Sequence, residues 1–370
     1  MKSNKFGVAI IGCGIISDSH IQAYEANNDR CEIKAVCDLI PEKASQLASS
    51  INKEVMVYTD IQELLRREDI DIISICTPPF AHVNVAIAAL KAGKHVLCEK
   101  PLAASLEECD EIIEAAKKYK RKLAVCFQYR FRKDFNQIKH LINSKSLDKL
   151  TFGQLNGLYW RGDSYYDVDW RGRWKTECGG VTINHEIHML DIFLWLMGEV
   201  DSVSAEIDTI SHNIEVEDVS MAVIRFANGA IGQVNGTVSS AITDVTMNIS
   251  GIRKGVSIPL KFHAVKENEN GFPVVDHEGV TELKKKANEI CTGTNDHTGP
   301  VNDLLKAIIN DEEPFVNGEE GRRVVEVITA IYKSGSTGQR VQLPINKSDP
   351  WYTTVGLQSL VKKGAERNIV

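Results

Sequence analysis

Nearly continuous apolar runs recur between residues 6 and 127, separated by stretches in which apolar residues return every three or four positions. A strand covered on both faces needs no polar positions, so the continuous runs predict buried parallel strands and the intervening periodicity predicts helices. We expect strands at residues 6–11, 33–38, 55–58, 70–76, 95–98 and 123–127. Strands that alternate with helices predict a doubly wound parallel α/β sheet.

After about residue 150, short segments alternate between apolar and polar residues. Such alternation predicts antiparallel strands, and Asn228-Gly229 between two of them predicts a hairpin turn. We expect strands at residues 200–210, 219–226, 230–238, 245–250 and 338–343, helices at residues 181–197, 303–310 and 321–335, and a mobile polar segment at residues 266–282. The change of pattern and the length of 370 residues predict two domains, residues 1–127 and 128–370, with C-terminal helices able to pack back on the first.

The turn after the first strand carries Gly12 and Gly14, and an acidic residue, Asp38, ends the second strand. Gly12 permits a sharp turn, and Gly14 lets a pyrophosphate approach the N–H groups at the start of the next helix. That helix starts near Ile15 and Ile16. Asp38 falls where it can accept hydrogen bonds from ribose hydroxyls, and its charge repels a 2′-phosphate. The pattern therefore predicts NAD, rather than NADP, as the cofactor.

Ligands of a doubly wound sheet bind beyond the carboxyl ends of its strands. Several residues at these ends are therefore predicted cofactor contacts: Thr77, Pro78, His82, Glu99, Lys100 and Gln128. Beside a cationic nicotinamide, the pKa of Lys100 would fall, and its ammonium group would polarise a substrate hydroxyl. The alternative for Lys100 is a solvent-exposed lysine in a turn.

The predicted helix at residues 181–197 carries Asn184, His188 and Asp191 on one face. The ordinary pKa of histidine lies near neutrality, so His188 is suited to accept a hydroxyl proton, and Asn184 to position the same hydroxyl. Asp191 belongs either to this site or to the core. His185 and His188 are three positions apart, whereas the zinc-protease motif needs four, and catalytic zinc usually has three protein ligands. We therefore expect no metal.

A segment rich in aromatic residues and arginine, Trp160 to Trp174, precedes this helix. Aromatic faces suit a sugar ring, and an arginine fork suits a carboxylate or a phosphate. Tyr166, Trp170 and Arg171 are therefore predicted to bind substrate. The same residue types are enriched at interfaces, so an oligomer contact or packing within the loop remains the alternative.

Composition limits the range of partners. The net charge of −7 argues against nucleic acid, because phosphate binding needs a concentrated basic surface. No stretch approaches the ~20 apolar residues of a membrane span. The nine cysteines include no C-x-x-C pair, and several lie inside apolar strands, which is typical of small buried side chains in a reducing compartment. The apolar run before Cys13 is too short for a secretion signal, so we expect a cytoplasmic protein.

The order and spacing of these motifs resemble the Gfo/Idh/MocA oxidoreductases, which are relatives of glucose–fructose oxidoreductase and inositol dehydrogenase. The resemblance covers nearly the whole chain. It rests on Gly12-x-Gly14, Asp38, Thr77-Pro78, Glu99-Lys100-Pro101, Gly179-Gly180 and the residues Asn184, His188 and Asp191.

The resemblance implies an N-terminal Rossmann domain and a C-terminal α/β domain whose open, mainly antiparallel sheet mediates homodimers or homotetramers. It implies catalytic roles for Lys100 and His188 at the substrate hydroxyl. Many members have aspartate in place of Asn184, and the amide removes one proton relay. The implied substrate contacts are Lys100, Arg130, Tyr166, Trp170, Arg171, Asn184 and His188.

The sequence therefore predicts an NAD-dependent oxidoreductase that moves hydride between nicotinamide and a secondary hydroxyl of a sugar, cyclitol or sugar nucleotide. Tyr165-Tyr166 and Trp170-Arg171-Gly172 also resemble the branch that oxidises UDP-N-acetylglucosaminuronate-type sugars at C3. Two alternatives remain. One is an NAD-dependent glycosidase that acts through transient C3 oxidation, and the other is a non-catalytic NAD-binding sensor.

Overall fold

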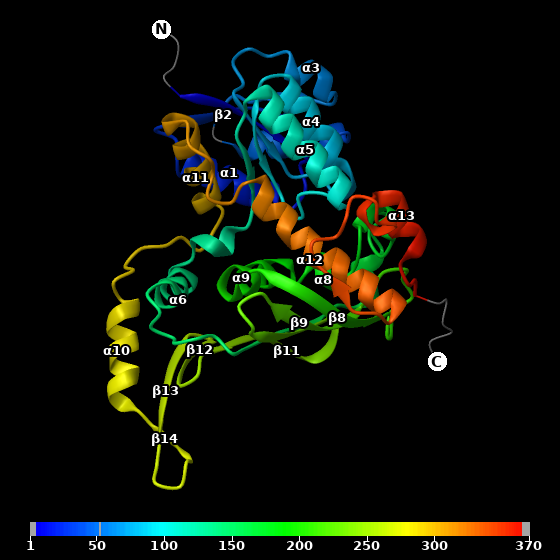
Figure 1. The fold of residues 1–370 in the computed structure, drawn as a ribbon. Helices are drawn as coiled ribbons and strands as arrows, with labels where there is room; N and C mark the ends of the chain where they lie inside the picture. The colour runs from blue at the N-terminus through cyan, green and yellow to red at the C-terminus, as the bar shows by residue number, and fades with distance from the viewer. Residues whose placement is uncertain (1–4, 52, 365–370) are drawn as a thin grey trace. The chain divides into compact units, whose positions relative to one another are not determined.

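The computed structural model describes residues 5–51 and 53–364, which divide into two compact units (Figure 1). The first unit comprises the described residues up to Gln128 together with Thr294–Val325, and the second comprises Tyr129–Gly293 and the described residues from Glu326 onward. The sequence placed this boundary after residue 127. Residues Thr294–Val325 belong to the first unit and contain the helix at Thr298–Asn310. The sequence had left open whether the C-terminal helices pack on the first domain.

The first unit contains, among the described residues, a parallel six-stranded sheet in the order β3-β2-β1-β4-β5-β6. Its strands are β1 (Phe6–Ile11), β2 (Cys31–Cys37), β3 (Met56–Tyr58), β4 (Ile72–Ile75), β5 (His95–Cys98) and β6 (Leu123–Val125). Its helices are α1 (Ser17–Glu25), α2 (Pro41–Ser50), α3 (Ile61–Leu65), η1 (Pro79–Ala81), α4 (His82–Lys91), α5 (Leu106–Tyr119) and α11 (Thr298–Asn310). The prediction of a doubly wound parallel sheet is confirmed.

One face of this sheet is covered by α1, α2 and the returning helix α11. Val8 and Ile10 of β1 are fully buried in the core that these helices form. From α11, the side chains of Val301, Leu304 and Leu305 are also fully buried. Each buried aliphatic side chain contributes about 1.5–3 kcal/mol, so α11 stabilises the sheet from which the glycine turn projects.

The second unit contains a nine-stranded sheet in the order β14-β13-β12-β11-β7-β10-β9-β8-β15, counted over the described ranges. Only β7 and β10 pair in parallel there; the other neighbours are antiparallel. The strands are β7 (Phe152–Trp160), β8 (Val200–Asp208), β9 (Val219–Phe226), β10 (Ile231–Thr237), β11 (Ser239–Ser250), β12 (Lys254–Ile258), β13 (Lys261–Glu267), β14 (Pro273–Val275) and β15 (Val341–Gln342). The predicted, mainly antiparallel second sheet is confirmed.

The helices of this part of the chain are α6 (Lys133–Asn143), α7 (Trp174–Glu177), α8 (Val181–Asn184), α9 (Ile187–Met197), α10 (His277–Ala287) and α13 (Thr354–Leu360). The 3-10 helices are η2 (Gln128–Phe131), η3 (Asp163–Tyr166) and η4 (Pro350–Tyr352). Helix α12 (Gly318–Thr337) begins in the first unit and ends in the second.

Helix α9 lies close to the sheet because glycines line the strands beneath it. Gly153 of β7 pairs with Gly232 of β10. A Cβ atom at Gly153 would lie 2.7 Å from the ring of Phe193, and one at Gly232 would lie 2.9 Å from it. Any larger residue at these two positions would push α9 away from the sheet.

The helix expected at residues 181–197 is interrupted, which corrects the sequence-based prediction. Helix α8 ends at Asn184, and α9 begins at Ile187. The apolar spacing on both sides of the break fits one helix, so periodicity alone could not detect it.

Glu186 lies in this break and is fully buried against the second glycine pair, Gly157 of β7 and Gly236 of β10. A Cβ atom at these glycines would lie 3.0 Å and 1.9 Å from the carboxylate oxygens of Glu186. Burial raises the pKa of Glu186 well above its ordinary value. Burial against the sheet therefore favours the neutral, protonated form of Glu186.

The expectation of a mobile polar segment at residues 266–282 is wrong, because β14 and most of α10 lie there. Asp276 caps α10 by accepting a hydrogen bond from the N–H of Gly279 at 3.1 Å. Leu283 and Ala287 are buried, whereas the other side of the helix is rich in lysine. The density of charge concealed an amphipathic helix.

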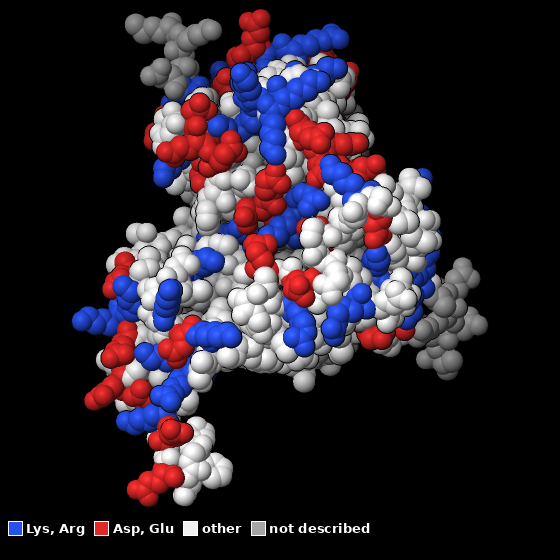
Figure 2. All heavy atoms as spheres, in the orientation of Figure 1, with Lys and Arg blue, Asp and Glu red and all other residues white. Residues whose placement is uncertain are grey.

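Basic and acidic side chains are interspersed over both units on the face that Figure 2 shows. This mixture lacks the concentrated basic stripe that a nucleic-acid surface requires. Within the described ranges, no helix combines the length and the apolar character that crossing a bilayer demands.

The second unit buries an ion pair between Arg130 of η2 and Asp191 of α9. Arg130 Nε lies 2.8 Å from Asp191 Oδ2, and Nη2 lies 2.6 Å from Oδ1. The side chains are only 1% and 0% exposed. A paired guanidinium and carboxylate tolerate such burial, but neither tolerates it alone.

We expect Asp191→Asn to lower the free energy of unfolding by about 3–5 kcal/mol, because it removes the negative charge that pairs with the buried guanidinium of Arg130. Urea denaturation measures this change. The control is Glu319→Gln, which breaks the exposed Lys117–Glu319 pair and should cost less than about 1 kcal/mol. Equal losses in the two variants would contradict the structural role of the buried pair.

Candidate active site

The glycine turn between β1 and α1 is tightly packed at Gly12 and open at Gly14. Gly12 has φ +91°, and a Cβ atom there would lie 2.7 Å from the backbone carbonyl of Cys76, so only glycine fits. At Gly14, a Cβ atom would have no atom of the described chain within 4 Å, so the space beside this glycine is open. The backbone N–H groups of Gly14 and Ile15 have no hydrogen-bond acceptor in the part of the chain that the structure describes.

Asp38 braces this turn from the end of β2. Its Oδ2 accepts a hydrogen bond from the N–H of Cys13 at 2.8 Å, and its Oδ1 accepts one from the N–H of Ile40 at 2.9 Å. The carboxylate is half-buried, and its oxygens retain further acceptor capacity. The hydrogen bonds to ribose hydroxyls stay a prediction.

Two polar atoms at strand ends of this sheet are buried and have no hydrogen-bond partner among the described residues. They are Thr77 Oγ1, just after β4, and Gln128 Oε1, just after β6. Buried polar atoms are normally satisfied, so these two fit groups that a ligand would bind. Together with the open turn at Gly14, they make the first unit suited to a dinucleotide, with pyrophosphate on the turn.

His82, a predicted cofactor contact, instead lies inside the first unit. Its side chain is fully buried, and its ring nitrogens lie 2.8 Å from the carbonyl oxygen of Pro101 and 2.9 Å from that of Thr77. His82 therefore ties together the turns that follow β4 and β5. This burial favours a structural role for His82 over the predicted direct cofactor contact.

Glu99 was also a predicted cofactor contact, but its buried carboxylate is shared by two imidazoles. Its Oε1 lies 2.9 Å from His20 Nε2 and 3.2 Å from His297 Nε2, and Ser74 Oγ lies 2.7 Å from His20 Nδ1. Burial by itself raises the pKa of Glu99, but the hydrogen bonds from His20 and His297 hold it well below its ordinary value. Its Oε2 accepts from the backbone N–H of Lys100 at 3.1 Å. The network therefore fixes the backbone from which Lys100 projects.

Cys126 lies beside this network and completes a group with metal-ligand chemistry. The carboxylate and imidazole atoms lie at hydrogen-bond distance from one another. Burial raises the pKa of the Cys126 thiol well above its ordinary value, whereas a metal binds the thiolate. We therefore assign this group to hydrogen bonding.

On the substrate side, α8 and α9 present Asn184 and His188, both half-buried. The ring of His188 lies 5.1 Å from that of Tyr129. The side-chain amide of Asn184 donates to the carbonyl oxygen of Gly179 at 2.7 Å and, at 3.4 Å, to those of Glu177 and Gly180. An aspartate at this position would direct a carboxylate at the same carbonyl groups, which explains why an amide suits this chain.

Gly179 and Gly180 precede α8 because two other groups occupy the space of their side chains. A Cβ atom at Gly179 would lie 2.1 Å from the hydroxyl of Tyr332, and one at Gly180 would lie 1.8 Å from the carbonyl oxygen of Glu217. The buried carboxylate of Glu217 accepts hydrogen bonds from the N–H groups of Gly180 at 2.8 Å and Thr182 at 3.0 Å. These contacts fix the start of α8, one turn before Asn184.

Arg171 lies between aromatic rings in the aromatic–arginine segment (residues 160–174). Its guanidinium carbon lies 3.9 Å from the ring centre of Tyr165 and 4.3 Å from that of Trp170. Nη1 donates to Glu177 Oε1 at 3.2 Å. Burial raises the pKa of Glu177 to about 7, so this acid titrates near neutrality. Tyr166 meets Tyr165 edge to face, with ring centres 5.2 Å apart.

Of the predicted substrate residues, the second unit therefore places Tyr166, Trp170 and Arg171 in one cluster. The ring of Tyr165 lies 5.6 Å from that of His185, which links this cluster to the α8–α9 break. Arg130 is not part of it. Its burial with Asp191 favours a structural role over the expected substrate contact.

Sequence reasoning missed the buried polar residues that support the site, which are His20, Glu177, Glu217, His212 and Asp218. Most of them contact partners far away in the chain, so no local motif marks them. The available signal was an ionisable residue on the apolar face of a helix, such as His20, three and four positions before Ala23 and Tyr24 in α1.

Comparison with known proteins covers both units. Residues 6–127 match the model of the oxidoreductase family with an NAD-binding Rossmann fold, GFO_IDH_MocA. Residues 135–256 match the model of the GFO/IDH/MocA C-terminal domain.

Several relatives carry the similarity further. D-glucoside 3-dehydrogenase of Escherichia coli is 28% identical over 364 residues, which cover 93% of this chain and 99% of the relative. Inositol 2-dehydrogenase of Salmonella typhimurium is 31% identical over 191 residues, 51% of this chain and 54% of the relative. The crystal structure of the WlbA dehydrogenase from Bordetella pertussis, in complex with NADH and UDP-GlcNAcA, is 26% identical with a TM-score of 0.81 and covers 92% of this chain and 100% of that chain.

The two glycines of the turn should respond differently to substitution by alanine. We expect Gly12→Ala to lower the free energy of unfolding by about 1–3 kcal/mol, because it strains a positive-φ position against Cys76. Gly14→Ala should leave stability nearly unchanged but weaken NAD binding roughly tenfold, because the new methyl group blocks the approach of the pyrophosphate. Thermal unfolding without NAD and calorimetric titration with NAD separate the two effects. Unchanged NAD affinity in Gly14→Ala would contradict the assignment of this turn as the pyrophosphate-binding site.

Proposed function

Because this chain belongs to the GFO/IDH/MocA oxidoreductase family, we propose that it is an NAD-dependent dehydrogenase of a sugar, cyclitol or sugar nucleotide. The observation that carries this proposal is that the second unit presents an oriented amide, Asn184, at the end of α8 and an imidazole, His188, in the first turn of α9. When bound, NAD supplies the acceptor for the hydride of a secondary alcohol.

The chain's own residues would manage the proton. Oxidation of a secondary alcohol releases the hydroxyl proton, and His188 is suited to accept it because histidine titrates near neutrality. We propose that the ammonium of Lys100, whose backbone is held by Glu99, polarises the same hydroxyl. Asn184 would orient the substrate from the turn in which its amide is anchored.

For the substrate we propose a pyranose that carries a polar or anionic substituent. Support comes from the cluster of Tyr166, Trp170 and Arg171, since aromatic faces bind sugar rings and a guanidinium binds carboxylate or phosphate. It also comes from two relatives, a D-glucoside 3-dehydrogenase and a dehydrogenase bound to UDP-GlcNAcA.

We expect Lys100→Ala and His188→Ala each to lower kcat by at least about 100-fold, because each removes a group that acts on the reacting hydroxyl. NAD affinity should stay near that of the wild type. The measurement is NAD reduction with a panel of glycosides, inositols and UDP-sugars, followed by titration of NAD into each variant.

Matched controls are Lys91→Ala and His277→Ala, which change exposed residues. Wild-type turnover in both Lys100→Ala and His188→Ala would contradict the catalytic roles proposed for these residues. Release of a free aglycone without net NADH would instead indicate a glycosidase, and NAD binding without any turnover would indicate a sensor.

We also propose that the open sheet forms a homodimer or homotetramer. Along β9, buried residues alternate with exposed ones, and Met221 and Val223 on the outer side are 56% and 50% exposed. Such exposed apolar residues on a flat sheet suit a second copy of the chain. We expect sedimentation to show an oligomer that Met221→Glu with Val223→Glu weakens at least tenfold, because charges oppose burial at the interface. A wild-type monomer would contradict the proposal.

A further inference from the structure

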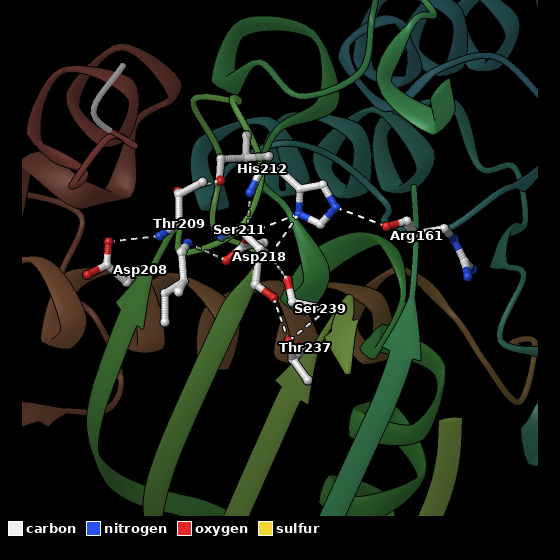
Figure 3. A network of polar contacts seen from close by, with 10 residues as sticks. Arg161, Asp208, Thr209, Ser211, His212, Asp218, Thr237 and Ser239 are labelled. Atoms are coloured by element: carbon white, nitrogen blue, oxygen red, sulfur yellow. Dashed lines mark hydrogen bonds and ion pairs between the residues drawn. The ribbon is translucent and has the colours of Figure 1, made fainter. Parts of the chain in front are cut away.

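The loop between β8 and β9, residues 209–218, carries a buried polar network centred on Asp218 and His212 (Figure 3). Asp218 is fully buried, and His212 is only 7% exposed. This network lies outside the residues to which a catalytic role was assigned. It contacts the aromatic–arginine segment directly.

Asp218 is an ionised carboxylate, as the number of its donors shows. Its Oδ1 accepts from the N–H of Ile210 at 2.7 Å, and its Oδ2 accepts from the N–H groups of Ser211 at 2.8 Å and His212 at 3.1 Å. The hydroxyl of Ser211 donates to Oδ2 as well, at 3.0 Å. Although burial raises its pKa, the hydrogen bonds from His212 and the backbone lower the pKa of Asp218 to about 2.

The nearest partner of each ring nitrogen of His212 only accepts hydrogen bonds (Figure 3). The hydroxyl of Ser211 lies 3.4 Å from Nδ1 but closer, at 3.0 Å, to Asp218 Oδ2. Nδ1 lies 3.0 Å from Asp218 Oδ2, and Nε2 lies 3.0 Å from the carbonyl oxygen of Arg161. A carbonyl oxygen cannot donate, and neither can an ionised carboxylate, so each of these two hydrogen bonds forms only when the ring nitrogen carries a hydrogen. The arrangement therefore favours the imidazolium form of His212, and the hydrogen bond to Asp218 raises the pKa of His212 above the ordinary 6.5.

The network is not a Ser-His-Asp hydrolase triad. A triad needs a histidine nitrogen free to take the proton of a serine hydroxyl. Here Nε2 is bound to a carbonyl oxygen, and the hydroxyl of Ser211 lies nearest Ser239 and Asp218. The role of His212 must therefore follow from the residues that it contacts.

His212 contacts the aromatic–arginine segment through Arg161 and Tyr166. The ring of His212 lies 5.1 Å from that of Tyr166. The same loop donates from the N–H of Glu215 to the carbonyl oxygen of Gly172 at 2.8 Å, and the indole N–H of Trp174 donates to the carbonyl oxygen of Glu215 at 2.9 Å. Both ends of the segment are thus hydrogen-bonded to residues 209–218, and His212 is the residue of this loop whose ring lies beside that of Tyr166.

We propose that His212 is a positioning residue, which holds Tyr166 and the aromatic–arginine segment in the conformation that binds substrate and releases them when it loses its proton. The proposal rests on the proposed function, because it assigns sugar binding to this segment. It adds that substrate affinity depends on the charge of a histidine that touches neither cofactor nor reacting hydroxyl.

The direction of the pH dependence follows from the raised pKa. A group whose pKa is higher in the folded state stabilises that state fully below its unfolded pKa, and this stabilisation is lost as the pH rises through the folded value. Three ionisable groups face His212. They are Asp218, in the loop between β8 and β9, and Asp163 and Tyr166, in the aromatic–arginine segment. Both carboxylates favour the imidazolium. Burial raises the pKa of Tyr166, so this phenol stays neutral across the range.

Hydrogen–deuterium exchange of the wild-type protein without substrate tests the structural step. We expect peptides from residues 161–173 to lose protection between about pH 6 and about pH 9, after correction for intrinsic exchange. His212→Gln, which can serve only one of the two acceptors well, should show low protection that no longer depends on pH. The control His277→Gln, on the exposed start of α10, should behave like the wild type. Protection that is independent of pH in the wild type would overturn the proposal.

Kinetics test the functional step. His212→Gln should raise KM for the sugar roughly tenfold, as expected for a lost hydrogen bond to a charged group, with kcat changed less than about threefold and NAD affinity unchanged. A fall in kcat with an unchanged KM would overturn the positioning role.

Two further readouts keep the outcomes distinct. If no sugar is oxidised by the wild type, the proposed function fails, whereas the exchange experiment still decides whether His212 controls the segment. If His212→Gln does not fold, the 15N shifts of His212 in the wild type decide, because a neutral ring at about pH 6 would overturn the proposal.

Discussion

The close approach of α8 and α9 to the nine-stranded sheet is the constraint on which the substrate side of this protein depends. The helices can lie so near the strands only because glycine pairs leave space for Phe193 and Glu186. That distance sets where Asn184 and His188 project. A side chain at Gly236, for example, would meet the carboxylate of Glu186 and displace the break between the helices. Since misplacing a reacting group by about 1 Å can cost a hundredfold in rate, strand glycines far from the chemistry still bear on it.

Buried carboxylates position other residues of the candidate site. Glu99 is held between two imidazoles and receives the N–H of Lys100, Glu217 fixes the start of α8, and Asp218 holds His212. A buried charge is tolerated only when hydrogen bonds compensate its desolvation, so each acid imposes a defined geometry on the groups around it. In each case the acid orients residues with a proposed role in binding or chemistry, although the acid itself is withdrawn from solvent.

The parts proposed to carry the oxidation chemistry and the part proposed to select the substrate are held in place in different ways. The glycine turn and the strand-end residues belong to regular elements of the first unit, whose geometry the sheet dictates. The aromatic–arginine segment has little regular structure, and side-chain contacts from Glu177, Glu215 and His212 hold it in place. Loops of this kind can change their residues without disturbing a core. Substrate choice is therefore expected to reside in this segment, and the oxidation chemistry in the parts that the family shares.

The sequence by itself determined the doubly wound sheet, the glycine turn with Asp38 and most strands of the second sheet, because periodicity and glycine conformation act over a few neighbouring residues. It also singled out Lys100 and His188. Only the tertiary structure decided that Arg130 is buried with Asp191, 61 positions further along, and that the helix breaks where Glu186 packs on the sheet. The physical reason is that the burial and pairing of a charged side chain depend on partners that the fold, not the local sequence, brings beside it.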